Sequence, residues 1–348
     1  MMRAAVLEEI SRLRLKQVPV PEPGPGEVLM RIETNTICGT DLRIISGAKT
    51  AGVRPGVILG HEFAGRVAAV GRGVDGVPVG AQVTCSIVVS CQRCRACLSG
   101  REQLCENLVL FGYELDGGLA EYLLVPRIAM DHGNLVVLEK EIPATTLALT
   151  EPVSCCLNGA GQVAVAPGES VVVLGTGPIG LLHIALAKLV GATTILAAGR
   201  EGRLAAATDF GATCAVALTG EALTAEVCER TNGRGADVVI VAVGDLALAN
   251  QALELAAIGG RVNYFAGFPK GKTASIDPNL IHYRELAVTG GSNARRADVR
   301  RAVELLSSGA LDVGRLVTHR FPLAELDAAV TAVARRDGLK VAVMPEAG

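Results

Sequence analysis

The apolar residues of the chain follow two patterns, and the change lies near residue 170. After this point, short apolar runs alternate with stretches of helical spacing such as 246–260. We expect strands near residues 171–174, 193–198, 214–217, 237–242, 261–266 and 286–290. Strands that alternate with helices favour a parallel sheet covered by helices on both faces. This part therefore predicts a complete doubly wound sheet of the Rossmann type.

Before residue 170 the chain has a different texture, in which short β-like runs such as 28–35 are separated by turns rich in proline and glycine. After residue 292, two helical patterns lead to a last strand over 339–345, which we expect to return to the first β-rich part. The chain is thus predicted to be an α/β protein with a β-rich domain and a second domain built on the doubly wound sheet. These two domains are expected to cover 1–151 together with 292–348, and 152–291.

Composition narrows the class further. Half of the 348 residues are apolar, only 3% are aromatic and 41 are glycine, which favours an α/β protein over a sandwich or a disordered chain. The formal net charge of -2 gives nucleic acid or an anionic membrane no electrostatic reason to bind. Glycine and proline interrupt the apolar stretch 170–192, so it is expected to be strand, turn and helix and not a membrane span. Because the N-terminus lacks the hydrophobic region of a signal peptide, we expect a cytoplasmic protein.

Four cysteines lie close together in the stretch "CQRCRACLSGREQLC", at Cys91, Cys94, Cys97 and Cys105. In a reducing compartment, clustered cysteines bind metal more often than they form disulfides, and four thiolates suit one tetrahedral Zn²⁺. An iron–sulfur site is the alternative, but the bacterial ferredoxin run closes with a gap of three residues and a proline. Here the gap is seven and Glu106 follows. Four thiolates leave no open position, so we expect a structural zinc in a lobe near 90–106.

A second set of metal-binding side chains comes from three separate segments, "CGTD", "GHEFAGRV" and "LTEPVSCC". Cys38, His61 and Glu62 provide the mixed ligand set of a catalytic zinc. Glu151 is an alternate ligand or a partner of the bound water. Spacing alone leaves simpler explanations open, because a single histidine often serves a structural role and a single cysteine is often a small buried side chain.

The segment "GTGPIG" follows an apolar strand directly and opens a helical pattern. Gly175, Gly177 and Gly180 permit the tight turn, the close approach of a pyrophosphate and close packing of strand on helix. Pro178 and Ile179 lie in the same turn. This context predicts a nicotinamide dinucleotide site. The expected cofactor contacts at the ends of later strands are Val243, Ala266 and Gly267.

Taken together and in this order, "CGTD", "GHEFAGRV", the four-cysteine lobe, "TEPVSCCLNG" and "GTGPIG" resemble the zinc-dependent medium-chain alcohol dehydrogenases. Within them the sorbitol (polyol) and threonine dehydrogenase branch is the most similar. The resemblance covers essentially the whole chain. It implies a GroES-like catalytic domain built from both ends of the chain and a Rossmann cofactor domain in the middle. It also implies two zinc ions per subunit and a homodimer or homotetramer.

By position, the resemblance makes Cys38 and His61 ligands of the catalytic zinc, with Glu62 and Glu151 as rival third ligands. Asp41 corresponds to the carboxylate that orients the His61 imidazole on the metal. The implied reaction converts a secondary alcohol of a small polar substrate into its ketone. Zinc lowers the pKa of the substrate hydroxyl, and hydride passes to the nicotinamide.

The chain departs from the family at two positions. Thr40 occupies the place of the hydroxyl that serves the first proton step, but the histidine found three residues further on in many relatives is Arg43 here. An arginine cannot act as a base near neutral pH, so water carries the proton or Arg43 has another role, such as binding cofactor phosphate. The arginine near the substrate of polyol dehydrogenases falls close to Asn293, which puts sorbitol in doubt. A polyol, cyclitol, amino-polyol or vicinal diol remains open.

The choice of cofactor depends on "ILAAGREGRL", which follows the second Rossmann strand. Enzymes that prefer NAD usually have an acidic residue there, whereas this chain has Ala198. Gly199 leaves room for a 2′-phosphate, and Arg200 or Arg203 can pair with it. Glu201 is a complication, because it could take the ribose role and restore NAD use. We expect NADP to be favoured over NAD.

Two other functions compete with this one. A zinc-free quinone or enoyl reductase shares the fold, although "CGTD" and "GHE" argue against it. The third candidate is a non-catalytic interaction protein in which the cysteine lobe is a contact module. Its basic residues are few and lack interleaved aromatics, so binding of nucleic acid is not expected.

Overall fold

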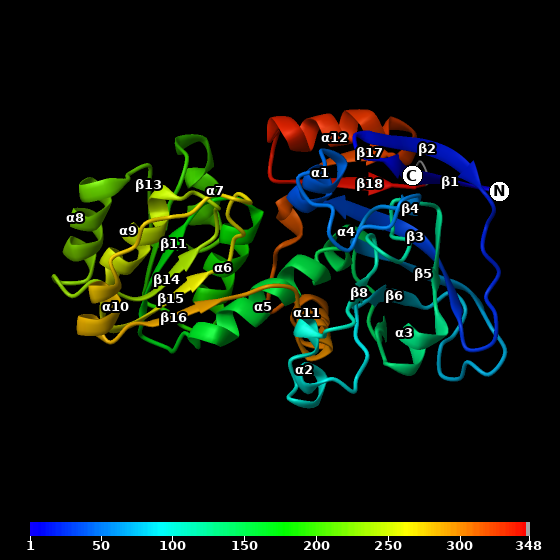
Figure 1. The fold of residues 1–348 in the computed structure, drawn as a ribbon, viewed down its shortest axis with the longest axis horizontal. Coiled ribbons are helices and arrows are strands. Elements are labelled where there is room, and N and C mark those ends of the chain that lie inside the picture. The colour runs from blue at the N-terminus through cyan, green and yellow to red at the C-terminus, as the bar shows by residue number, and fades with distance from the viewer. Residues whose placement is uncertain (346–348) are drawn as a thin grey trace. The chain divides into compact units, whose positions relative to one another are not determined.

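The computed structural model describes residues 1–345, which form two compact units (Figure 1). Unit 1 contains residues 1–154 and the chain from 293 onward, and unit 2 contains residues 155–292. The expected boundary near residue 151 falls in the first turn of α5 (Thr150–Val163), which begins in unit 1 and ends in unit 2.

Unit 2 is built around one sheet of six parallel strands in the order β13-β12-β11-β14-β15-β16. The strands are β11 (Ser170–Leu174), β12 (Thr194–Ala198), β13 (Cys214–Val216), β14 (Ala236–Val241), β15 (Ala256–Tyr264) and β16 (Ala287–Gly290). The doubly wound sheet predicted from the sequence is therefore confirmed. The strand order changes direction between β11 and β14, and ligands of such folds bind beyond the carboxyl ends of the strands at this point.

The central strands of unit 2 are buried on both faces, which is why their sequences are continuous apolar runs. The helices between them are α6 (Pro178–Leu189), α7 (Leu204–Asp209), α8 (Gly220–Arg230), α9 (Ala247–Leu255) and α10 (Pro278–Arg284). A short 3₁₀ turn, η2 (Glu201–Arg203), precedes α7.

The helix expected over 246–260 is wrong in its second half. α9 ends at Leu255, and Ala256 already pairs with Ala236 at the start of β15. Gly259 has a left-handed φ of 71°, which a helix does not accommodate. A Cβ at Gly260 would lie 2.8 Å from the carbonyl oxygen of Ala257, so these glycines make the bend that opens the strand.

Unit 1 is β-rich. Its main sheet has seven strands in the order β10-β6-β5-β3-β18-β17, with β9 paired to β3, and smaller sheets join β2-β1-β4 and β7-β8. The strands are β1 (Met2–Glu9), β2 (Arg12–Val18), β3 (Val28–Ile37), β4 (Val57–Ile58), β5 (Glu62–Val70), β6 (Gln82–Cys85), β7 (Val88–Val89), β8 (Val109–Leu110), β9 (Tyr122–Val125), β10 (Leu135–Val137), β17 (Val317–Pro322) and β18 (Lys340–Met344). The expected return of the last strand is observed, because β18 pairs antiparallel with β3.

The helices of unit 1 lie at the ends and faces of these sheets. They are α1 (Gly39–Ile45), α2 (Arg95–Leu98), α3 (Arg127–Asp131), α4 (Ala144–Leu147), the start of α5, α11 (Arg296–Ser307) and α12 (Leu326–Arg335), with 3₁₀ turns η1 (Glu102–Leu104), η3 (Gly314–Leu316) and η4 (Leu323–Glu325). α12 packs its apolar face on β18 and β17, burying Leu326 and Ala329 in one core cluster with Val341.

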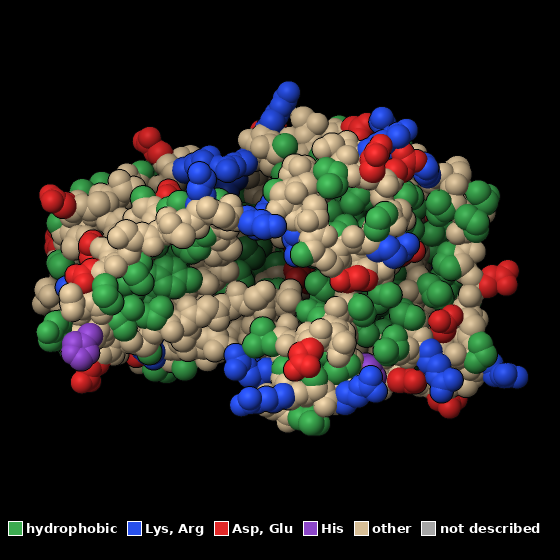
Figure 2. Space-filling model, in the orientation of Figure 1, with side chains coloured by type: hydrophobic (Ala, Val, Ile, Leu, Met, Phe, Trp, Pro, Cys, Tyr) green, Lys and Arg blue, Asp and Glu red, His purple; other side chains and the backbone are tan. Residues whose placement is uncertain are grey.

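None of the helices formed by residues 1–345 is long and apolar enough to cross a membrane. The segment 170–192 is a strand, a turn and a helix, as the glycine pattern predicts. Basic and acidic side chains are both spread over the face shown in Figure 2, in keeping with a formal net charge of -2.

Candidate active site

Cys38, His61 and Glu62 are brought together at one end of the main sheet of unit 1. Their ligand atoms all lie within 4.8 Å of one another. Glu62 begins β5, where it pairs with Thr36 of β3, and Cys38 is the N-cap of α1 directly after β3. The antiparallel pairing of β3 with β5 therefore places the ends of two distant motifs side by side. His61 and Glu62 are buried and Cys38 is partly exposed, which leaves one side of the group accessible.

Asp41 contacts two members of this group, Cys38 and His61. Its Oδ2 accepts a hydrogen bond of 2.8 Å from the backbone N–H of Cys38. Its Oδ1 lies 3.2 Å from His61 Nδ1, although neither atom has a well-aligned hydrogen bond within the described chain. Burial is the largest single influence and disfavours the charged imidazole, but the charge and hydrogen bonding of Asp41, together with Tyr113 and Cys38, raise the pKa of His61 well above its ordinary value. With Nδ1 facing a carboxylate, Nε2 is the nitrogen left for a metal.

The donor set fits a zinc ion. A thiolate, an imidazole and a carboxylate form the mixed ligand set of a catalytic zinc, and the contact of His61 Nδ1 with Asp41 leaves Nε2 for the metal. Such a metal would compete with the proton on His61, so its binding would weaken at low pH.

Glu62 has a partner that no motif predicts. Both oxygens of its carboxylate contact the ammonium of Lys340, the Oε1 contact measuring 2.5 Å. Thr36 donates a hydrogen bond to Oε2. The two charged residues are 278 positions apart in the sequence, and both are buried. In the sequence, the one sign of this contact is that Lys340 begins the otherwise apolar strand β18. Burial is the largest single influence and disfavours the charged ammonium, but Glu62, together with Cys38 and Glu151, raises the pKa of Lys340.

Tyr113 and Lys49 are also close to this group and were missed by sequence reasoning. The ring of Tyr113 lies 5.4 Å from the imidazole of His61 between centroids, and the ammonium of Lys49 lies 5.3 Å from the Tyr113 centroid. Burial raises the pKa of Tyr113, so its hydroxyl stays protonated. Glu151, in the first turn of α5, is not part of the compact three-residue group, although its charge acts on Tyr113 and Lys340. Thr40 lies in the first turn of α1 and is partly exposed.

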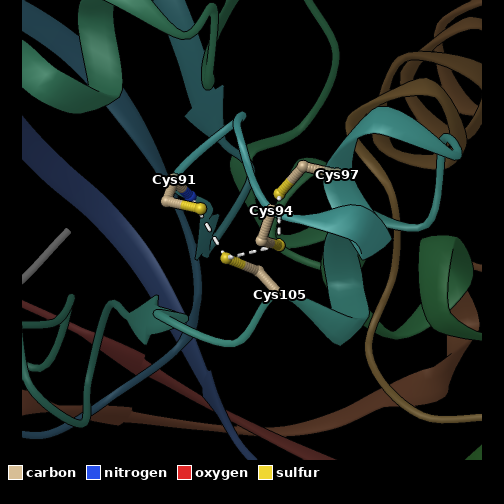
Figure 3. A group of neighbouring side chains, drawn as sticks. All are labelled: Cys91, Cys94, Cys97 and Cys105. Carbon is tan, nitrogen blue, oxygen red and sulfur yellow. Dashed lines mark hydrogen bonds between the residues drawn. The ribbon is translucent and has the colours of Figure 1, made fainter.

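The four clustered cysteines point toward one another (Figure 3). Cys94 Sγ lies 3.5 Å from Cys97 Sγ and 3.9 Å from Cys105 Sγ. Backbone N–H groups of Cys91 and Asn107 donate to Cys105 Sγ, and hydrogen bonds from the backbone of residues 93 and 94 lower the pKa of Cys91 to about 6. At Cys105, burial outweighs such donors and raises the pKa to about 12. The four converging sulfur atoms nevertheless fit a closed tetrahedral metal site.

The lobe is attached to the rest of unit 1 by Glu102. Its carboxylate accepts a hydrogen bond of 2.8 Å from the backbone N–H of Arg296, the first residue of α11, and a second of 3.2 Å from the Arg296 guanidinium. A carboxylate at a helix N-terminus satisfies an otherwise unpaired N–H group.

The glycine turn of unit 2 has the geometry that the sequence predicts. Gly175 has a φ of 109°, and a Cβ at Gly180 would lie 1.8 Å from the carbonyl oxygen of Gly175. Gly177 is the N-cap of α6, with Pro178 at its first position and Ile179 next. Only glycine allows this approach of the helix to the strand, and it leaves the N-terminus of α6 open toward an anion.

Gly199, Arg200 and Arg203 lie beside this turn, between β12 and α7. A Cβ at Gly199 would lie 2.0 Å from Thr176 Oγ1, so the glycine is required for packing against the turn. Arg200 is exposed, and the Arg203 guanidinium approaches Gly177, where an added Cβ would be 3.5 Å from Nη1.

The remaining expected cofactor residues lie at the carboxyl ends of β14 and β15. Val243 faces Gly175, where an added Cβ would meet Val243 Cβ at 3.1 Å. Ala266 donates its backbone N–H to the carbonyl of Val241, and Gly267 approaches Gly244. All three therefore lie near the point where the strand order reverses.

Comparison with known proteins agrees with this architecture. A family model described as "Alcohol dehydrogenase GroES-like domain" matches residues 24–132, and one described as "Zinc-binding dehydrogenase" matches residues 178–308. L-Threonine 3-dehydrogenase of Pyrococcus furiosus is 37% identical over 313 residues, which are 88% of this chain and 87% of that protein. The enzyme of the same name from Stenotrophomonas maltophilia is 32% identical over 326 residues, which are 92% of this chain and 93% of that protein.

Solved structures are similar over the whole chain. A zinc-binding dehydrogenase of Sinorhizobium meliloti 1021 bound to NADP has a TM-score of 0.92 at 35% identity, covering 99% of both chains. The 2R,3R-butanediol dehydrogenase of Bacillus subtilis has a TM-score of 0.89 at 28% identity, covering 99% of this chain and 100% of that one.

A GroES-like unit followed in sequence by a zinc-binding dehydrogenase unit defines a class of oxidoreductase. The chain belongs to the zinc-dependent medium-chain alcohol dehydrogenase family, in its threonine and polyol dehydrogenase branch. The fold and family predicted from the sequence are thereby confirmed, and the protein is a zinc-containing, NAD(P)-dependent alcohol dehydrogenase. This assignment excludes the non-catalytic interaction protein and disfavours the zinc-free reductase.

Proposed function

We propose that the protein interconverts a secondary alcohol of a small polar substrate and its ketone, using a catalytic zinc in unit 1 and a nicotinamide cofactor in unit 2. The observation that carries the proposal is the compact group of Cys38, His61 and Glu62, which is partly exposed on the cysteine side. The relatives of this chain include enzymes named for threonine and for butanediol, and both of these compounds carry a secondary alcohol.

Cys38 and His61 are the proposed metal ligands, with Glu62 or Glu151 as the third. When bound, zinc supplies Lewis acidity, which lowers the pKa of a coordinated hydroxyl. Asp41, next to Nδ1 of His61, would orient the imidazole so that Nε2 faces the metal. Thr40, in the first turn of the helix that Cys38 caps, is the proposed hydroxyl for the first proton step. Arg43 cannot serve as the next base, so water is the proposed carrier from Thr40 onward.

The four cysteines of the lobe are proposed to hold a second, structural zinc, which gives two ions per subunit. They share no residue with the first group. NADP is proposed to be the preferred cofactor, because Ala198 replaces the acidic residue and two arginines, Arg200 and Arg203, follow in the same turn. The space expected at Gly199 is not open, because Thr176 fills the position of its missing side chain.

Metal analysis combined with steady-state kinetics tests the two-zinc proposal. Cys38→Ser should abolish turnover while the thermal unfolding midpoint stays within a few degrees of wild type. Cys94→Ser should instead lose one zinc and lower the unfolding midpoint strongly, because the lobe would lose the metal that holds its cysteines together. Full activity of the Cys38→Ser variant with one zinc bound would show that the first group is not catalytic.

The substrate is proposed to be a polyol, cyclitol, amino-polyol or vicinal diol. A panel of these alcohols assayed with NADP and with NAD tests this directly. Turnover of none of them, with either cofactor, by the fully zinc-loaded enzyme would contradict the proposed reaction.

A further inference from the structure

Unit 1 contains a pocket that the proposed reaction does not use. It lies between the end of β1, helix α1 and the loop that follows α1, has a volume of about 150 Å³ and is partly open to solvent. Its walls are mainly apolar and are formed by Leu7, Ile10, Ile44, Val53 and Pro55. An engineered apolar cavity of about this volume in another protein takes up benzene. The pocket can therefore hold an apolar group of about six heavy atoms.

Backbone hydrogen bonds fix the walls of this pocket. Ser11 N–H donates to the carbonyl of Ile45 at 2.7 Å, which ties the turn after β1 to α1. Gly56 N–H donates to the carbonyl of Leu7 at 2.8 Å, which ties the loop to β1. The floor is rigid as well, because Leu7 and Ile44 are 4% and 1% exposed and belong to one core cluster. The pocket is thus preformed, and a ligand would not have to order it.

Three charged residues line the pocket, and only one of them lacks a partner of opposite charge. Glu9 is paired with Arg12 at 3.1 Å, and Arg54 is paired with Asp116 at 2.7 Å. Over residues 1–345, the ammonium of Lys49 has no hydrogen bond or ion pair with a carboxylate. The pocket therefore carries one uncompensated positive charge.

Lys49 is placed where this charge can act on a ligand. Its ammonium lies 5.3 Å from the centre of the Tyr113 ring, and contact with a neutral ring leaves the charge uncompensated. Tyr113 belongs to the same core cluster as the floor residues Leu7 and Ile44. The lysine is partly exposed, and its flexible four-carbon side chain lets the ammonium turn toward a group in the pocket.

The combination of apolar walls and one free ammonium defines the chemistry of a ligand. An apolar body displaces water from walls that cannot hydrogen-bond to it, which favours binding. A carboxylate on that body can pair with the ammonium of Lys49 through a charge-assisted hydrogen bond. A cationic ligand would instead be repelled, and a strongly hydrated anion without an apolar body would leave the walls in contact with water.

We propose that this pocket binds a small monocarboxylate with an apolar body, whose carboxylate pairs with Lys49 and whose body lies on Leu7 and Ile44. The pocket is separate from the proposed metal ligands, because none of Cys38, His61 and Glu62 lines it. Two kinds of compound share the required chemistry, a short aliphatic acid and an aromatic acid. Hexanoate and benzoate represent them.

Calorimetric titration of the zinc-loaded protein with matched probes tests the proposal. Acetate lacks the apolar body, hexanol lacks the charge and hexylamine carries the opposite charge. We expect hexanoate or benzoate to bind once per chain and at least about tenfold more tightly than each of these three compounds. The tighter of the two acids shows which shape of body the pocket prefers.

Variants of the lining residues locate the bound acid. Lys49→Met should weaken binding of the preferred acid about 10- to 100-fold, because a charge-assisted hydrogen bond is lost. Lys49→Arg keeps the charge and should retain most of the affinity. Thr50→Trp places a large side chain at an exposed lining position and should also weaken binding. Lys140→Met removes an exposed lysine elsewhere and should bind the acid as wild type does.

Cys38→Ser separates this pocket from the metal group, because a carboxylate can also bind to a metal ion. The acid should bind to this variant with unchanged affinity. The inference is overturned if neither acid binds more tightly than hexanol, or if Lys49→Met leaves the affinity unchanged. It is also overturned if Cys38→Ser abolishes binding, which would place the acid on the metal. Thermal unfolding confirms that each variant is folded, and turnover of alcohols tests the proposed function independently.

Discussion

At the scale of single residues, the Glu62–Lys340 pair places two charges in a buried part of the candidate active site. A buried pair is costly to break, because removal of one partner leaves the other charge without compensation. Thr36 alone would then satisfy the carboxylate of Glu62. The lysine is therefore expected to hold the Glu62 carboxylate in place beside Cys38 and His61.

We predict that Lys340→Met lowers the free energy of unfolding by about 3–5 kcal/mol and reduces the zinc retained after dialysis. Chemical denaturation and metal analysis measure the two effects. The double variant Glu62→Gln/Lys340→Met removes both charges and should recover most of the stability but not the zinc. If the double variant were as unstable as the single one, the loss would come from packing and not from an unpaired charge.

At the scale of elements, the turn between β12 and α7 is the segment that we propose selects between NADP and NAD. Arg200 is exposed at its start, and Arg203 reaches back toward Gly177 in the glycine turn. An arginine binds a phosphate with two parallel charge-assisted hydrogen bonds. Arg203 approaches the turn where a pyrophosphate would lie, so we propose Arg200 as the residue that binds a 2′-phosphate.

We predict that wild type prefers NADP and that Arg200→Ala lowers kcat/KM for NADP about tenfold while that for NAD changes little. Specificity constants for both cofactors measure this. Arg234→Ala, an exposed arginine outside the turn, is the control. A wild-type enzyme that favours NAD tenfold, or an unchanged ratio in the Arg200 variant, would contradict the prediction.

Helix α6 contains a buried histidine, His183, that bears on stability in acid. His183 is fully buried in it, and neither ring nitrogen has a hydrogen-bond partner among residues 1–345. The ring instead packs edge-on against Phe265 at 4.7 Å. Burial disfavours the charged form and lowers the pKa of His183 to about 3. The folded protein thus keeps this histidine neutral at pH values where the unfolded chain is protonated.

We predict that this group makes the protein less stable in mild acid. Between pH 6.5, its ordinary pKa, and about pH 3, the unfolded chain binds one more proton at this site, so stability falls as the pH falls. From pH 7.5 to pH 5 the contribution is about 2 kcal/mol. His183→Leu should lose correspondingly less stability over this range in denaturant titrations. Equal losses in both proteins would show that the histidine takes up its proton in the folded state.

At the scale of the whole molecule, β16 is an edge strand of the unit 2 sheet. Val288 in this strand is 38% exposed, and Tyr283, shortly before it in the sequence, is 76% exposed. Ile258, in the neighbouring strand β15, is 81% exposed. An open edge with apolar neighbours is a place where a second chain can add strands.

We predict a homodimer or homotetramer in solution, formed through this edge. Light scattering at micromolar concentration should give a multiple of 35.9 kDa. Val288→Lys should shift the population toward the monomer, because a charge on an edge opposes pairing. Val79→Lys, at an exposed apolar residue of unit 1, is the matched control. A monomeric wild type would refute the prediction.

The glycine turn and the cysteine lobe could be predicted because their parts are neighbours in sequence. Gly175 and Gly180 are five residues apart in one turn. The carbonyl oxygen of Gly175 lies so close to residue 180 that only glycine fits there. Cys91 to Cys105 form one short loop, so their spacing already limits the geometry. The central strands β11 and β14 of unit 2 were also predictable, because they are nearly fully buried and mostly apolar.

The sequence by itself therefore determined the family, the two kinds of domain and the residues of each local motif. Only the tertiary structure decided which distant side chains meet at the site. Lys340 reaches Glu62 because β18 pairs with β3 and β3 pairs with β5, and a shift of one residue in either register would turn the lysine to the other face. Tyr113 meets His61, and Lys49 meets Tyr113, through loops whose paths depend on packing and not on period. Contacts of this kind are fixed by strand register and by close packing, which no local pattern of residues encodes.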